Sequence, residues 1–170
     1  VAGTNGKGST VALLEAFARG AGLRTGVYTS PHLVRYNERI AIDGVPATDE
    51  ELVAAFERIE AARGEVALTF FEFGTLAAWE AFSGAAVDAV ILEVGLGGRL
   101  DAVNVFDADC AVVTSIDLDH MDYLGETREA PCVPVGALVD DGGRPVVFEQ
   151  VDGESFERRP VTLGASAGGY

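Results

Sequence analysis

The chain has 170 residues, of which 48% are hydrophobic and 23% are charged, a composition that fits one globular domain with a substantial core. Asp and Glu number 27 against 12 Lys and Arg, so the net charge of −15 excludes bulk electrostatic binding to nucleic acid or to anionic lipid. Any bound phosphate must therefore be held by a local arrangement of backbone N–H groups, a helix N-terminus, one or two cations or a metal. The sequence shows neither an apolar run of about 18 residues nor a charged-then-apolar leader, so we expect a cytoplasmic protein that does not cross a membrane.

The residue pattern predicts alternating helices and strands over most of the chain. Capping-box patterns at Thr48–Glu51 and Thr69–Glu72 begin two of the helices, and Gly64 ends the first of them. A turn signal at Asp43–Gly44 indicates a hairpin. In chain order, we predict a helix over 9–20, a strand over 25–29, a hairpin arm over 39–42, helices over 48–64 and 69–84, and strands over 87–94 and 110–116.

This order of elements predicts an α/β fold with a mostly parallel sheet flanked by helices. Residues 87–94 and 110–116 are mostly apolar and β-branched, which is typical of strands buried on both faces of a parallel sheet. Beyond residue 130, prolines and glycine pairs favour no helix, and only a hairpin around 146–148 is indicated. Cys110 and Cys132 have the spacing of neither a zinc site nor a disulfide framework, so we expect two buried thiols.

A glycine-rich segment that precedes the first helix predicts a phosphate-binding loop. Its residues are Gly3, Thr4, Asn5, Gly6, Lys7, Gly8 and Ser9. Glycines let the backbone wrap phosphate oxygens, the helix N-terminus favours the anion, and Lys7, the only lysine of the chain, neutralises the charge of the β- and γ-phosphates. Gly8 stands where the usual loop has the Ser or Thr whose hydroxyl binds Mg²⁺, so this hydroxyl must come from Ser9 or from Ser30.

Polar side chains cluster where the predicted strands end, and ligands of open parallel sheets collect at the carboxyl ends of strands. These residues are Lys7, Ser30, Glu93, Asp117 and His120. A buried carboxylate at Glu93 is costly unless it binds a metal or forms an ion pair, for which Arg99 is the candidate. His120 is flanked by three carboxylates, which suits either a neutral imidazole metal ligand or a histidine that only hydrogen-bonds locally.

Six motifs carry a resemblance to a known family. They are GTNGKGS at 3–9, TSPHL at 29–33, RYNERI at 35–40, TFFEF at 69–73, LEVGLGGRLDAVN at 92–104 and SIDLDHMDYLG at 115–125. In this order and at these intervals, the motifs resemble folylpolyglutamate synthase/dihydrofolate synthase of the Mur ligase superfamily over residues 1–129. The resemblance implies a P-loop-type Mur ligase central domain. It also implies an ATP-dependent ligase that adds L-glutamate to dihydropteroate or a reduced folate through an acyl phosphate.

The resemblance further implies roles for individual residues. ATP phosphates are expected on Gly3, Thr4, Asn5, Gly6, Lys7, Gly8 and Ser9, with Lys7 and His120 as catalytic residues. Mg²⁺ is expected on Ser30, Glu93 and His120. The pterin-bearing substrate is expected along Thr69, Phe70, Phe71 and Glu72, although the phenylalanines have the alternative role of packing a helix start. His32 and Arg35 either assist a substrate carboxylate or only pair with Glu38.

The sequence departs from the family pattern after residue 129. The family continues into a helix with the motif REKAGI, whose lysine is carbamylated and holds a second metal ion, whereas residues 130–135 read APCVPV. We therefore predict a truncated ATP-binding domain at 1–129 with an incomplete first strand, and an atypical tail at 130–170. We expect no second metal site and no C-terminal ligase domain, and hence a monomeric, marginally stable chain that is inactive alone. The alternatives are another Mur-type amide ligase and a non-catalytic nucleotide-binding remnant.

Overall fold

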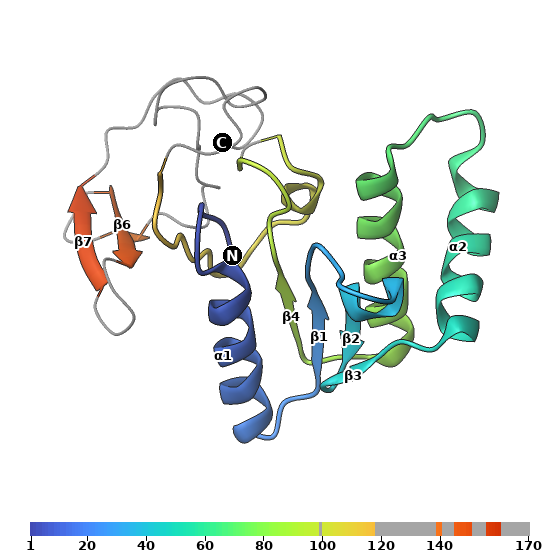
Figure 1. Cartoon of the computed structure of the whole chain (residues 1–170), viewed down its shortest axis with the longest axis horizontal. Helices are drawn as coiled ribbons and strands as arrows, with labels where there is room; N and C mark the ends of the chain where they lie inside the picture. Colours follow the sequence, from blue (N-terminus) through green and yellow to red (C-terminus); the bar gives the residue numbers. More distant parts are fainter. Residues whose placement is uncertain (99, 118–138, 141–144, 151–155, 161–170) are drawn as a thin grey trace. The chain divides into compact units, whose positions relative to one another are not determined.

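The computed structural model describes residues 1–98, 100–117, 139–140, 145–150 and 156–160 (Figure 1). The chain divides into two compact units, one made of residues 1–10 with 96–170 and the other of residues 11–95. The predicted α/β class is confirmed, because helices and a sheet alternate along the described chain.

The unit of residues 11–95 contains a four-stranded sheet in the order β3-β2-β1-β4. Its strands are β1 (Thr25–Tyr28), β2 (Ile40–Ile42), β3 (Val45–Pro46) and β4 (Ala89–Leu92). Strands β1 and β4 are parallel, whereas β2 is antiparallel to both β1 and β3. This sheet is therefore mixed and not mostly parallel as predicted. Only a loop and the short 3₁₀ helix η1 (Tyr36–Arg39) separate β1 from β2, and a parallel connection normally needs a longer crossover, usually with an α-helix.

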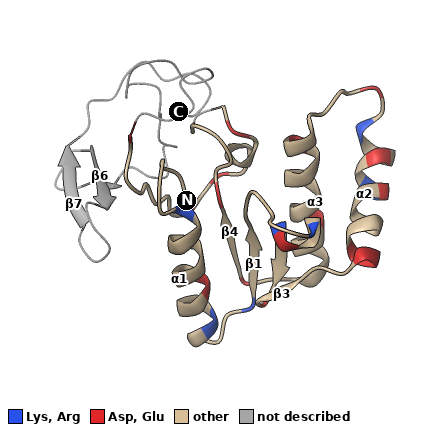
Figure 2. Cartoon of the chain, in the orientation of Figure 1, with Lys and Arg blue, Asp and Glu red and all other residues tan. Residues whose placement is uncertain are grey.

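Two helices form a layer beside this sheet: α3 (Phe70–Ala85) packs on β1 and β2, and α2 (Asp49–Arg63) packs on α3 (Figure 1). Thr48 and Thr69 cap these helices through the predicted capping boxes, since each hydroxyl accepts from the backbone N–H three residues later. Figure 2 shows acidic and basic residues spread along α2, whose first turn carries three acidic residues that complement the helix dipole.

The core of this unit is built around β1, whose four residues are all buried. Phe82 of α3 is 1% exposed, and a Cβ at Gly26 of β1 would lie 2.6 Å from its ring. Only glycine at this position therefore allows the helix to approach the strand this closely.

Two expectations about burial are wrong. Strand β4 is shorter than predicted and Val90 is 36% exposed, so β4 is not buried on both faces; β1 is the strand that is. Cys110 is exposed, and Cys132 lies outside the described residues.

In the other unit, the predicted strand at 110–116 is reduced to isolated bridges that join Ala2 to Val113 and Asn5 to Ser115. The pairing is interrupted because Gly3 has φ +131°, which takes the backbone out of strand geometry. The short 3₁₀ helix η2 (Ala102–Val105) also belongs to this unit.

The predicted hairpin near residue 147 is confirmed: β6 (Pro145–Gln150) pairs with β7 (Phe156–Pro160), and β5 (Val139–Asp140) pairs with β6, all antiparallel. None of the described helices has the length and hydropathy that a membrane crossing requires.

Candidate functional site

The predicted phosphate loop turns into helix α1 (Lys7–Gly20). Gly3 and Gly6 have positive φ values of 131° and 83°, which residues other than glycine rarely adopt. The Lys7 ammonium donates to the carbonyl oxygens of Gly3 at 2.8 Å and Thr4 at 3.3 Å, so the lysine folds back over the loop that precedes it. A Cβ built on Gly6 meets no atom within 4 Å, which leaves open space beside the loop at the N-terminus of α1.

The loop is held by the segment 112–117 of the same unit. Thr4 donates its backbone N–H to the Ser115 carbonyl at 2.8 Å, and its hydroxyl bonds the backbone of Asp117 as donor at 3.0 Å and as acceptor at 2.9 Å. A Cβ on Gly3 would collide with the Thr114 hydroxyl. Thr4 is therefore occupied in fixing the loop, and its hydroxyl is not free for a phosphate unless these bonds are exchanged.

Ser30 and Glu93, two of the three predicted metal ligands, lie together in the unit of residues 11–95. Ser30 follows β1 and Glu93 follows β4, so both stand at the edge where these parallel strands end. The Ser30 backbone N–H donates to Glu93 Oε2 at 3.0 Å, while the Glu93 N–H donates to the Tyr28 carbonyl at 2.9 Å. The prediction that these two residues meet at one sheet edge is thus consistent with the geometry, and their metal-binding role stays a prediction.

The chemistry of this pair fits a hard divalent cation. Glu93 is 5% exposed, and among the described residues it has no ion pair and no hydrogen bond to Oε1. A buried carboxylate without a counter-ion is costly, and carboxylate and hydroxyl oxygens are the donors that Mg²⁺ prefers. His120 and Arg99 lie outside the described residues, and within the described part no group of three His, Cys, Asp or Glu side chains converges.

The predicted substrate segment, residues 69–72, forms the start of helix α3. Thr69 and Glu72 form the capping box of α3, with the Thr69 N–H donating to Glu72 Oε2 at 2.7 Å. The pKa of the Glu72 carboxyl is lowered, chiefly because it accepts this bond. The ring centres of Phe71 and Tyr28 lie 5.6 Å apart. The ring centres of Phe70, which is more exposed, and Tyr36 lie 5.7 Å apart. Packing of the helix start is therefore observed, while contact with a substrate stays a prediction.

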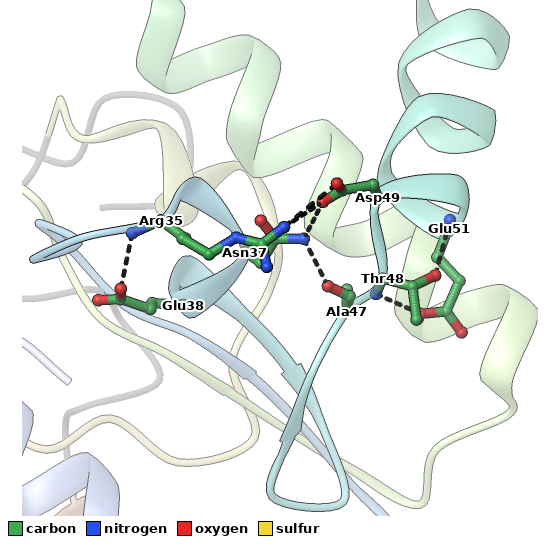
Figure 3. A network of polar contacts seen from close by, with 7 residues as sticks. All are labelled: Arg35, Asn37, Glu38, Ala47, Thr48, Asp49 and Glu51. Carbon is green, nitrogen blue, oxygen red and sulfur yellow. Dashed lines mark hydrogen bonds and ion pairs between the residues drawn. The ribbon is translucent and has the colours of Figure 1, made fainter.

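His32 and Arg35 do not pair with Glu38 through their side chains. The Arg35 guanidinium bonds both oxygens of Asp49, at 3.0 and 3.1 Å, and Figure 3 shows Asn37 pointing to the same carboxylate. Glu38 instead accepts three backbone N–H groups, those of residues 33–35, which lower the pKa of its carboxyl. This network fixes the loop after Ser30, and its residues line a surface cavity of about 450 Å³ at the start of α2.

Arg39 is a residue of this edge that the sequence patterns did not single out. It is 9% exposed, and its Nε–H donates to His32 Nδ1 at 2.8 Å. Its guanidinium carbon lies 5.7 Å from the ring centre of Tyr36 and 5.5 Å from that of Phe70. Its sequence signals are a place in the RYNERI motif at 35–40 and at the start of the alternating run 39–42, and neither pattern indicates that the arginine is buried.

Comparison with known proteins decides the family. The Mur ligase middle domain matches residues 1–130. The chain belongs to the Mur ligase middle-domain family. Dihydrofolate synthase/folylpolyglutamate synthase of Escherichia coli (strain K12) is 58% identical over 130 residues, which cover 76% of this chain and 31% of that protein.

Solved structures of this Mur ligase group agree. E. coli FolC in complex with DHPP and ADP gives a TM-score of 0.74 at 57% identity, covering 76% of this chain and 31% of that one. A bifunctional folylpolyglutamate synthase/dihydrofolate synthase with Mn, AMPPNP and L-glutamate bound gives 0.72 at 58% identity, covering 75% and 32%. The family predicted from the six motifs is confirmed, and the chain spans about a third of the length of these relatives.

Proposed function

We propose that this chain carries the nucleotide and metal site of an ATP-dependent ligase that joins L-glutamate to dihydropteroate or a reduced folate. The observation that carries the proposal is the buried Glu93 carboxylate, without a counter-ion among the described residues and bonded to Ser30 where β1 and β4 end. The homologues support it, since one is solved with DHPP and ADP and another with Mn, AMPPNP and L-glutamate.

In this proposal the loop from Gly3 to Ser9 binds the phosphates and Lys7 balances their charge. Backbone N–H groups at the start of α1 are pre-oriented toward an anion, and Lys7 is held close to them by its bonds to Gly3 and Thr4. Both features favour the extra negative charge that develops during phosphoryl transfer, so they stabilise the transition state more than the ground state. The P-loop-type architecture and the domain extent 1–129 are part of this proposal, supported by the family match to residues 1–130.

Ser30, Glu93 and His120 would hold Mg²⁺, with Ser30 in place of the hydroxyl that Gly8 cannot supply. The ion would supply positive charge that offsets the negative charge of the phosphates. Glu93 would contribute a fixed negative charge at the end of β4, and the bond that it accepts from the Ser30 backbone N–H would orient the carboxylate before the ion arrives. Thr69, Phe70, Phe71 and Glu72 would line the acid substrate, and the free thiol of Cys110 accords with a reducing, cytoplasmic location.

Titration calorimetry of the full chain with Mg-AMPPNP tests this function. We expect K7Q to lose most of the binding, and the charge-matched control R58Q, which removes an exposed Arg58–Glu80 pair, to keep it. Equal binding by wild type and K7Q would refute the proposal. Dihydropteroate and a UDP-muramyl peptide, added separately, distinguish a folate ligase from another Mur-type ligase by which one raises the melting temperature. Binding of AMPPNP together with ATP turnover that never rises with pterin acid and glutamate would favour a non-catalytic remnant.

A further inference from the structure

The guanidinium of Arg39 is a buried cation without an anion among the described residues. Arginine carries five N–H donors, and only Nε–H has a recorded partner here, the neutral ring nitrogen Nδ1 of His32. No carboxylate lies within 4 Å of Arg39 in the described part of the chain. Arg39 as a residue is 9% exposed, and its unbonded Nη atoms keep some contact with solvent, so an anion can reach them from the surface.

The surroundings of Arg39 attract a cation but do not neutralise it. Its guanidinium lies against the rings of Tyr36 and Phe70, whose π-faces stabilise a positive charge. Burial, together with the nearby Tyr28, raises the pKa of Tyr36 to about 12 although Arg39 itself lowers it, so Tyr36 stays an uncharged phenol at neutral pH. His32 also adds no negative charge, because its Nδ1 accepts the Arg39 bond through a lone pair.

Phe70 adds a surface for a flat ring beside this charge. It is 66% exposed although it packs edge-on against Tyr36 and lies next to the guanidinium. An aromatic ring stacked on Phe70 would leave its carboxylate within the reach of the four Nη–H donors, which match the two oxygens of a carboxylate.

The position of Arg39 in the fold indicates which molecule this aromatic carboxylate belongs to. Strand β2 runs antiparallel to β1, so Arg39, just before β2, lies beside Thr29, just after β1; the Thr29 N–H donates to the Arg39 carbonyl at 2.9 Å. Ser30 and Glu93 stand at the same edge. We propose that Arg39 is a specificity-determining residue that binds the carboxylate of the aromatic acid substrate, with Phe70 stacking on its ring. This inference rests on the proposed function and names the group of the acid that the chain recognises.

The test compares the binding of a carboxylate with the binding of its uncharged ester by the full chain. Titration calorimetry measures the affinities for pteroate, pteroate methyl ester and L-glutamate, and the affinity for AMPPNP is measured separately on the same proteins. We expect wild type to prefer the acid to its ester by roughly tenfold to hundredfold, as two charge-assisted hydrogen bonds imply. In R39Q the two should bind within about twofold of each other, whereas R35Q, whose guanidinium is already paired with Asp49, should keep the wild-type preference.

Two further variants keep the inference testable if R39Q does not fold. R39K keeps the charge but not the fork of donors, so we expect an intermediate preference. F70A removes an exposed ring and should weaken acid and ester alike, which leaves their ratio unchanged. The inference is overturned if wild type does not distinguish acid from ester, if R39Q and R39K both keep the full preference, or if L-glutamate and not pteroate responds to these changes. Normal AMPPNP binding with any of these results rejects the Arg39 site alone, and lost AMPPNP binding with a normal acid preference rejects the nucleotide site alone.

Discussion

Two substitutions of Glu93 separate its part in the fold from its part in the site. The carboxylate accepts the Ser30 N–H at 3.0 Å and is 5% exposed. E93A leaves that N–H without its acceptor, which costs about 1–3 kcal/mol of unfolding free energy. E93Q keeps an oxygen in place and removes a buried charge, so the weaker hydrogen bond and the relieved desolvation nearly cancel, and we expect a change below about 1 kcal/mol.

E93A and E93Q should differ in stability but should lose ligand affinity to a similar extent. Neither alanine nor glutamine supplies the negative charge that a divalent ion requires, so both variants should lose the gain in AMPPNP affinity that Mg²⁺ gives wild type, by roughly tenfold or more. Urea unfolding followed by circular dichroism gives the stabilities, and calorimetry with and without Mg²⁺ gives the affinities. A stable E93Q that retains the full Mg²⁺-dependent gain would refute the assignment of Glu93 as a metal ligand. An E93A as stable as wild type would show that the Ser30 bond contributes nothing.

Three other outcomes follow from local geometry. G3A should lose about 1–3 kcal/mol, because φ +131° is strained for alanine and its Cβ would collide with Thr114; thermal melting measures the loss. T69A should lose about 1 kcal/mol by removing the cap of α3, and T69S should restore most of it. The lowered pKa of Glu72 makes its contribution to stability fully present above the unfolded value of about 4.3 and lost as the pH falls through the lower folded value. As the pH is lowered from neutral to acidic, the melting temperature should therefore fall less steeply for E72Q than for wild type. An equally steep fall in both proteins would contradict the capping role.

The parts of the fold that the sequence predicted well depend on local chemistry. Thr48 and Thr69 cap their helices through bonds that span only three residues, so the residue types at those positions were enough to place both starts. The same holds for the Asp43–Gly44 turn, where both residues have positive φ and join β2 to β3.

The errors concern burial, which depends on partners distant in the sequence. Val90 lies in an apolar run, yet it is 36% exposed, and an apolar run by itself does not show whether another element covers the face to which a side chain points. Arg39 is the opposite case. It is 9% exposed, its guanidinium contacts Phe70 and bonds His32, which belong to other segments of the chain, and no periodicity near residue 39 carries that information.

Strand direction decides which residues can reach the edge where Ser30 and Glu93 stand. In an all-parallel sheet this edge collects only residues that follow strands, and an arginine that precedes a strand would lie at the opposite edge. Because β2 is antiparallel to β1, its first residues return to the carboxyl end of β1, and Arg39 joins Ser30 and Glu93 there. The mixed sheet therefore brings the backbone of Arg39 to the edge where Ser30 and Glu93 stand. If the proposed Arg39 and Glu93 roles are both correct, R39Q and E93Q should affect different ligands, the acid for R39Q and Mg²⁺ for E93Q, and calorimetry that finds each variant changing both equally would contradict this division.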